Sequence, residues 1–329
     1  MVSSLVLGAM LTSRYRVLEL IAKGGMGAVY KCADTRLEGR LCAIKETTID
    51  PNLSEPYLEQ TQEQFRLEAT TLATLDHPNL PKVSDYFSHR GRYYLVMDYV
   101  AGQDLLSIVK SSRRDKPGVP VDQVMGWTAQ ICSALQYLHT QSPPILHRDI
   151  KPANIKITEA GIIKLVDFGL VKWMAPDDNS TITVIQGLGT LAYTPLEQYG
   201  GDAGHTDPRS DIYALGATLY HLITGQLPAS AKERFLRPER FLPPDRLIPD
   251  LPPHVSKAIM AATAMHPEDR PSSASEFLDM LHDRMKPKIT TTPIRRYGDT
   301  WQAFARNNSR LLVFAGALLL ISLLLSLGV

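Results

Sequence analysis

The residues best suited to chemistry lie in the segment HRDIKPANIKI, which runs from His147 to Ile157. Asp149 can accept or orient the proton of an attacking hydroxyl, Lys151 can offset charge on a transferred phosphoryl group, and Asn154 can bind a hard cation through its amide oxygen. Eighteen residues after Asp149, the segment KLVDFGL places Asp167 at the end of a predicted strand, where a carboxylate can hold Mg²⁺ against phosphates. Each residue alone could be structural, so the prediction of phosphoryl transfer depends on their joint order and spacing.

A glycine-rich segment, IAKGGMGAVYK, lies between two predicted strands. Glycine lets the backbone approach a polyphosphate closely and present its N–H groups, although glycines in a hairpin often form only a turn. Eighteen residues past Gly27, the segment CAIK ends in Lys45, and a lysine that interrupts an apolar strand is unfavourable unless it meets an anion. Glu68, in a predicted helix, is either a solvated surface acid or the partner that holds Lys45 against that phosphate.

The elements that must position these residues fall into two groups, of which the first is mostly strands. From Tyr15 to about Tyr99, strand patterns occur in RYRVLELIA, AVYKCAD, RLCAIKETT, PKVSDYFSH and RYYLVMDYV. One helix interrupts them, because LEQTQEQFRLEATTLATL, Leu58 to Leu75, has apolar residues at roughly helical spacing before HPNLP ends it.

The second group, beyond Gly102, is mostly helical. Apolar residues recur at intervals of three and four residues in VDQVMGWTAQICSALQYLHT and SDIYALGATLYHLITG. Strand-like pieces remain only around Ile155 and Leu165. The predicted fold class is therefore α+β, with a small β-rich lobe, a larger helical lobe, and Asp98 to Gln103 as the hinge between them.

Composition excludes several classes of function. The 329 residues carry 35 basic and 34 acidic side chains, so the formal charge of +1 gives no general reason to expect nucleic-acid binding. The three cysteines are an odd number and form no CxxC pair, which argues against a disulfide framework or a cysteine metal cluster. The apolar start MVSSLVLGAML lacks a basic n-region, so we expect a loosely ordered start and not a signal peptide.

The segment LLVFAGALLLISLLLSLGV, residues 311–329, contains no charge and no proline. At ~1.5 Å per residue, a helix of this length would cross most of a bilayer core, so a tail anchor is predicted in preference to a buried core helix. Seven basic residues and one acid precede it in residues 284–310, which places the bulk of the chain on the cytoplasmic side. We expect a single-pass protein of the cell membrane that ends within the bilayer. Ser322 and Ser326 are spaced to let two such helices pack as a homodimer.

The phosphate-loop sequence GGMGAVY, Lys45, HRDIKPAN and DFG together resemble the protein kinase family, in particular the eukaryotic-like (Hanks-type) bacterial serine/threonine protein kinases. The match covers roughly Tyr15 to Leu281. It implies a bilobal protein-kinase fold that uses ATP and Mg²⁺, or Mn²⁺ in its place, to phosphorylate Ser or Thr in proteins. The expected domains are an N-terminal extension (1–14), a kinase N-lobe (15–99), a kinase C-lobe (100–283), a basic juxtamembrane linker (284–310) and a transmembrane helix (311–329).

The resemblance also implies a role for each matching residue, with Met97 as the gatekeeper and the backbone of Asp98 to Val100 facing adenine. Asp211 would brace the catalytic loop, and Glu197 would pair with Arg270. The implied site residues are Asp149 as catalytic base, Lys151 as transition-state support, and Lys45 in an ion pair with Glu68; Asn154 and Asp167 for the metal; and Ile21, Gly24, Gly25, Met26, Gly27, Val29, Ala43, Lys45, Met97, Asp98, Val100 and Lys156 for the nucleotide.

Three positions depart from the family pattern. Ala22 replaces the first glycine of the phosphate loop, TPLE replaces an APE-like segment, and Lys156 falls where many kinases offer an apolar side chain to adenine. Lysine can still offer its four-carbon stem there while its ammonium reaches water or phosphate. These departures motivate an alternative, a nucleotide-binding pseudokinase scaffold at the membrane, but none of them deletes a catalytic group.

Regulation is expected in the polar loop between Asp167 and Glu197. The resemblance is to the Ser/Thr-specific branch, and Arg148 could pair with a phosphate on Thr181 or Thr183 and so order the loop. Thr190 is a further candidate in this loop. The alternative is that these hydroxyl groups only solvate the loop.

Overall fold

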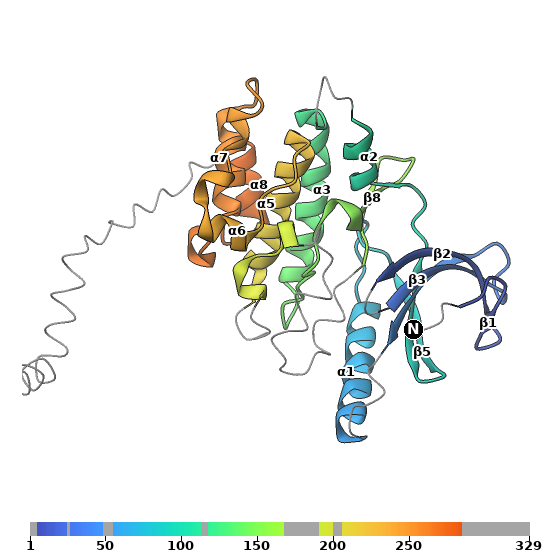
Figure 1. Ribbon diagram of the computed structural model, residues 1–329. Coiled ribbons are helices and arrows are strands. Elements are labelled where there is room, and N and C mark those ends of the chain that lie inside the picture. The colour runs from blue at the N-terminus through green and yellow to red at the C-terminus, as the bar shows by residue number, and fades with distance from the viewer. Residues whose placement is uncertain are drawn as a thin grey trace, which may run out of the picture. The chain divides into compact units, whose positions relative to one another are not determined.

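The computed structural model describes residues 5–24, 27–48, 55–112, 118–167, 191–199 and 206–284, all within one compact unit, Met1–Pro287. Strands dominate its first part and helices its second (Figure 1). The predicted division into a β-rich lobe and a larger helical lobe is therefore confirmed.

The first lobe is a six-stranded antiparallel sheet in the order β1-β2-β3-β4-β6-β5. The long helix α1 (Glu55–Ala73) contacts its β5 edge, where Phe65 packs against the rings of Tyr86 and Tyr93. The strands are β1 (Met10–Leu11), β2 (Tyr15–Gly24), β3 (Gly27–Asp34), β4 (Leu41–Thr48), β5 (Val83–His89) and β6 (Arg92–Asp98).

Alternation along the central strands gives this sheet two covered faces. Tyr30, Ile44 and Val96 are paired across β3, β4 and β6, and all three are buried in one apolar cluster, which we call the outer cluster. The next row, Lys45 with Leu95, points to the opposite face because successive side chains alternate. That opposite face packs against α1 and the helical lobe. The alternating pattern thus directs the Lys45 side chain away from the outer cluster and toward the second lobe.

The N-terminal segment pairs with this sheet through β1, so the expectation of a loosely ordered start for residues 1–11 is wrong for residues 5–11. β1 pairs with the beginning of β2. The Gly8 amide donates to the Val17 main-chain oxygen at 2.8 Å, and the Val17 amide donates to the Ala9 oxygen at 2.9 Å. Leu11 is 1% exposed and packs in the same outer cluster as Tyr30. The apolar residues of this segment cover a sheet face that would otherwise contact water. Residues 1–4 lie outside the described residues.

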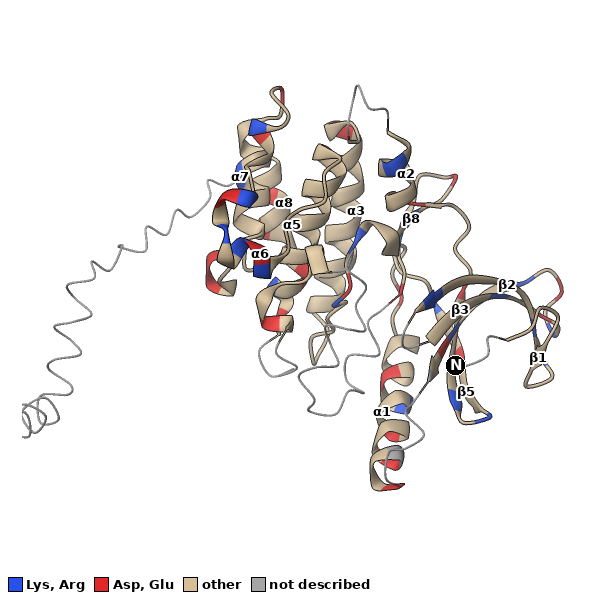
Figure 2. Ribbon diagram, viewed as in Figure 1, with Lys and Arg blue, Asp and Glu red and all other residues tan. Residues whose placement is uncertain are grey.

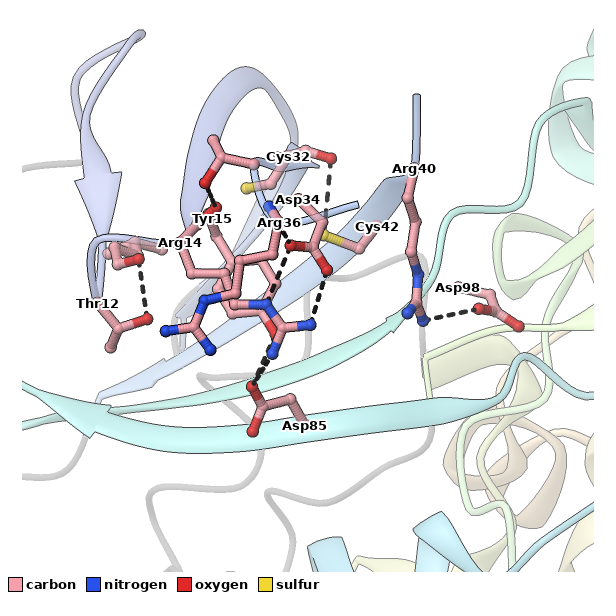
Figure 3. Close-up of polar contacts among 12 residues, drawn as sticks. Thr12, Arg14, Tyr15, Cys32, Asp34, Arg36, Arg40, Cys42, Asp85 and Asp98 are labelled. Atoms are coloured by element: carbon pink, nitrogen blue, oxygen red, sulfur yellow. Dashed lines mark hydrogen bonds and ion pairs between the residues drawn. The ribbon is translucent and has the colours of Figure 1, made fainter. Parts of the chain in front are cut away.

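A polar network fixes the edge of this outer cluster (Figure 3). Arg14 donates through Nε and Nη2 to the Asp34 carboxylate at 3.0 and 2.8 Å, and through Nη1 to Asp85 at 3.2 Å. Tyr15 Oη also donates to Asp85, at 2.7 Å. Because the Arg14 contact to Asp34 is bidentate, burial of the Asp34 carboxylate is compensated by two charge-assisted hydrogen bonds. The network joins the starts of β2 and β5 to the end of β3.

The second lobe is helical, with a small antiparallel sheet in the order β7-β8-β9. Its central helix is α5, in which every residue from Ser210 to Thr224 is buried. Gly216 allows close packing there, since a Cβ at this position would lie 2.8 Å from the Cβ of Ala262 in α7. The elements are β7 (Gln103–Asp104), α2 (Leu105–Ser111), α3 (Val121–His139), β8 (Ile155–Ile157), β9 (Ile163–Leu165), α5 (Pro208–Thr224), α6 (Ala231–Leu236), α7 (Pro253–Ala262) and α8 (Ala274–Leu281).

Within the described ranges, no helix is long and apolar enough to span a bilayer. The predicted membrane segment, 311–329, and nearly all of the predicted linker lie outside those ranges.

Candidate active site

The loop from His147 to Asn154 is held together around Asp149. Lys151 Nζ donates to Asp149 Oδ2 at 2.8 Å, and Asn154 Nδ2 donates to the same oxygen at 2.8 Å and to the Asp149 main-chain oxygen at 2.9 Å. A 3-10 turn, Pro152–Asn154, begins at Pro152. The fixed φ of proline suits this first helical position. The turn brings the three polar side chains to one place, as their spacing predicted.

Asp211 braces this loop from the buried helix α5, as predicted. Its carboxylate accepts hydrogen bonds from the main-chain amides of His147 and Arg148, both at 2.8 Å. Burial would raise the pKa of Asp211, but hydrogen bonding and charge from His139 and the loop lower it below its usual value. Arg148 has φ of 63°, in the left-handed region. The brace therefore holds a strained residue directly before Asp149, the predicted catalytic base.

Sequence reasoning missed His139, whose Nε2 lies 2.9 Å from Asp211 Oδ2. His139 ends α3, so it connects a second helix to the loop. The helical pattern of QYLHT could not single it out, because a histidine at the end of an amphipathic helix is commonly exposed.

Lys45 and Asp167, 122 positions apart, form a direct ion pair. Lys45 extends from β4, and Asp167 follows β9 with φ of 64°. Burial would raise the pKa of Asp167, but the charge and hydrogen bond of Lys45 lower it below the usual value. The Lys151 ammonium acts in the same direction. The carboxylate is therefore ionised at neutral pH and lies close enough to Lys151 to be influenced by its charge.

Glu68 lies on α1, a helix that carries mostly acidic charge (Figure 2). Within the described residues it forms no ion pair with Lys45, whose carboxylate partner there is Asp167. Burial raises the pKa of Glu68 to about 7, against the attraction of Arg148 and Lys45. The predicted Lys45–Glu68 pair is thus not formed in this conformation, although Glu68 is close enough to Lys45 to be influenced by its charge.

Three of the expected nucleotide residues lie on β3, β4 and β6, the strands around Lys45. Ala43 of β4 and Met97 of β6 are cross-strand partners, 9% and 7% exposed, and Val29 is half-buried on β3. Ile21 is 41% exposed on β2, on the strand that leads to Gly24.

The phosphate-loop turn requires Gly27. A Cβ at this position would lie 1.8 Å from the main-chain oxygen of Glu46, so only glycine fits against β4. Gly25 and Met26 lie outside the described residues.

Lys156 has a contact that was not predicted. Its ammonium, expected to reach water or phosphate, donates to the main-chain oxygen of Val100 at 3.0 Å. Val100 itself is buried, two residues beyond the end of β6. The hinge and β8 are therefore linked by a side-chain contact.

The residues expected to bind metal fit a magnesium ion that is shared with phosphates. No group of three or more His, Cys, Asp or Glu side chains suited to a metal occurs in the described part of the chain. Asp167 supplies an ionised carboxylate. Asn154 can supply its amide oxygen, since the contact with Asp149 is made by its Nδ2. Mg²⁺ is commonly bound through one or two such oxygens, with phosphates and water completing the octahedron.

The predicted pair of Glu197 and Arg270 is present, with Nη1–Oε1 and Nη2–Oε2 distances of 2.6 and 3.1 Å. Arg148, expected to bind a phosphate, is partly buried, and this burial lowers its pKa while Asp211 and Glu68 attract its charge. Thr181, Thr183 and Thr190 lie outside the described residues.

Residues 15–294 match the family model of the protein kinase domain. The chain therefore belongs to the protein kinase family, as its motifs predicted. Its relatives include the serine/threonine-protein kinases PknA of Mycobacterium tuberculosis, 34% identical over 298 residues, and PrkC of Bacillus subtilis, 33% identical over 279 residues. The predicted class, a bacterial-type serine/threonine protein kinase domain, is thus confirmed.

These alignments cover 87% of this chain and 65% of PknA, and 83% of this chain and 40% of PrkC. The chain thus spans less than two thirds of the length of these two curated relatives. Among solved structures, the apo form of PpkA-294 is similar with a TM-score of 0.68 and 28% identity, over 84% of this chain and 99% of that one.

Proposed function

We propose that this chain is a protein serine/threonine kinase that transfers the γ-phosphoryl group of ATP to Ser or Thr hydroxyl groups of proteins. The observation that carries the proposal is the meeting of residues from distant parts of the sequence. Lys45 contacts Asp167, and Asp149 is bound by Lys151 and Asn154 in the adjoining loop. The homologues named serine/threonine-protein kinases support the same substrate class.

Each side chain has a defined task in this reaction. Asp149 accepts the hydroxyl proton as the substrate oxygen bonds to the γ-phosphorus, and the bond from that phosphorus to ADP breaks with its electrons leaving on ADP. The Lys151 ammonium, 2.8 Å from Asp149, is placed to stabilise charge on the transferred group. Lys45 would bind ATP phosphates. Asp167 and Asn154 would hold Mg²⁺, which neutralises phosphate charge when bound.

Phosphate incorporation from radiolabelled ATP tests the proposal. Wild-type protein should label a Ser/Thr substrate such as myelin basic protein, and Asp149→Asn should lower the rate at least about 100-fold, because the proton acceptor is lost. Asp76→Asn removes an 85% exposed carboxylate and should keep wild-type activity. Nucleotide binding without labelling by the wild type would favour the pseudokinase scaffold instead.

Autophosphorylation of Thr181, Thr183 or Thr190 is the proposed route of activation. Arg148 supports it because this residue directly precedes Asp149 in the chain. Its guanidinium is attracted by Glu68, and a phosphate could take the place of that carboxylate. Phosphatase treatment should remove most activity, and incubation with ATP and Mg²⁺ should restore it. Activity that survives complete dephosphorylation would contradict this route.

We further propose that residues 311–329 tether the kinase to the cell membrane, with its catalytic domain in the cytoplasm. The support is compositional, since these 19 residues are free of charge and follow a basic segment. The full chain should stay in the membrane pellet after alkaline carbonate extraction, whereas a chain ending at residue 310 should be released. Crosslinking within the membranes would test the homodimer suggested by Ser322 and Ser326.

A further inference from the structure

The ammonium of Lys156 is held at the hinge by two electron-rich groups. Its Nζ donates to the Val100 main-chain oxygen at 3.0 Å and lies 5.8 Å from the centroid of the Tyr99 ring. The backbone of Lys156 is fixed by strand pairing with Asp104 of β7. Lys31 Nζ lies 4.6 Å from the same Tyr99 ring, so the hinge tyrosine has two cations near it.

The contact matters if the backbone of Asp98 to Val100 faces adenine, as the resemblance to kinases implies, because the Val100 oxygen would then lie beside the purine edge. In extended backbone, the N–H and C=O of one residue point to the same edge. If the Val100 N–H donates to purine N1, the atom next to N1, C2, faces the Val100 oxygen. Adenine has only hydrogen at C2, whereas guanine and 2,6-diaminopurine have an amino group there. A 2-amino group would therefore bring a second donor to an oxygen that already accepts from an ammonium.

We propose that Lys156 is a specificity-determining residue that selects adenine nucleotides over nucleotides of 2-aminopurines. Its ammonium occupies one of the two lone pairs of the Val100 oxygen, and its positive N–H groups repel the hydrogens of an amino group that approaches the other. The apolar residue usual in related kinases would leave this acceptor free. The inference rests on the proposed binding of ATP, and it adds a reason for the departure from the family pattern at position 156.

The test compares ATP with 2,6-diaminopurine riboside triphosphate, which differs from ATP only at C2. Dissociation constants of both are measured by calorimetry on the full chain in mild detergent with Mg²⁺. Wild type should bind the 2-amino nucleotide about tenfold more weakly than ATP, which is the effect of roughly one hydrogen bond. In Lys156→Met the ratio should fall to about one or below, because the Val100 oxygen is then free to accept.

Two further variants control the comparison. Lys164→Met makes the same substitution at the cross-strand partner of Lys156, whose Nζ donates to the Leu80 oxygen at 3.2 Å, and it should keep the wild-type ratio. Lys156→Arg keeps a cationic donor and should also keep discrimination, even if the Met variant folds poorly. Equal affinity of the wild type for both nucleotides, or an unchanged ratio in Lys156→Met, would overturn the inference. Failure of the wild type to bind ATP would instead reject the proposed function.

Discussion

At the scale of single residues, Glu68 differs most from its expected role. It is attracted by both Lys45 and Arg148, yet within the described part of the chain Lys45 pairs with Asp167. Burial outweighs these attractions and raises the pKa of Glu68 to about 7. Its charge therefore changes in the physiological range, and a neutral Glu68 has little to offer the Lys45 ammonium.

This raised pKa predicts a specific dependence of stability on pH. The folded state binds more protons than the unfolded state between about pH 4.5 and 7, so stability falls as the pH rises through that window. Between pH 5 and pH 8, the free energy of unfolding should fall by about 2 kcal/mol more for wild type than for Glu68→Gln. Urea unfolding at both pH values measures this difference.

Glu63→Gln is the matched control on the same helix. Glu63 is exposed, and its hydrogen bond with Arg66 lowers its pKa, so it is ionised in both folded and unfolded states from pH 5 upward. This variant should retain the wild-type pH dependence. Identical pH profiles for wild type and Glu68→Gln would contradict the raised pKa.

At the scale of elements, the N-terminal strand β1 is the main addition to the expected sheet. It has two residues, of which Leu11 is 1% exposed in the outer cluster and Met10 is 45% exposed on the opposite side. The outer cluster lies on the face of the sheet opposite to Lys45. β1 therefore stabilises the sheet without contributing a group to the active site.

Substitutions in β1 should separate stability from nucleotide binding. Leu11→Ala should reduce the free energy of unfolding by about 2 to 4 kcal/mol, because it leaves a cavity in the outer cluster. Met10→Ala should change it by less than about 0.5 kcal/mol, since its side chain is largely exposed. Both variants should keep the wild-type affinity for ATP at temperatures where they are folded. Equal effects of the two substitutions on chemical denaturation would contradict this packing.

At the scale of the whole molecule, the pair of Glu197 and Arg270 joins segments 73 positions apart in the helical lobe. The Arg270 side chain is 0% exposed and also donates to the Ala264 and Met265 main-chain oxygens at 2.8 and 3.0 Å. Hydrogen bonds and charge from Arg270 lower the pKa of Glu197, although burial would raise it. Removal of one partner would leave the other charge buried and unpaired.

We therefore expect Arg270→Ala to lower the free energy of unfolding by about 3 to 5 kcal/mol. Arg66→Ala, which removes a 52% exposed arginine from a surface pair with Glu63, should lower it by less than about 1 kcal/mol. Urea denaturation of the three proteins measures both effects. A loss for Arg270→Ala no larger than for Arg66→Ala would show that the buried pair contributes little.

The sequence could predict much of this fold and site because the signals were periodic or fixed in spacing. Lys45 was detectable because it interrupts an apolar strand, and the loop from Asp149 to Asn154 is too short to separate its polar groups. β1 was missed because two strand residues give no detectable period. The contact of Lys156 with Val100 could not be predicted, since a long flexible side chain can reach several acceptors. The partner of Lys45 depends on the position of α1, which local sequence does not determine.

The left-handed backbone at Arg148 and Asp167 has a consequence for how this chain could be altered. Glycine would adopt both conformations without strain, so glycine at either position should make the folded backbone easier to form. It would also remove the guanidinium beside the catalytic loop or the carboxylate that contacts Lys45. Relief of the backbone strain at either position is therefore opposed by the loss of a charged side chain, and the activity proposed for the protein requires that side chain.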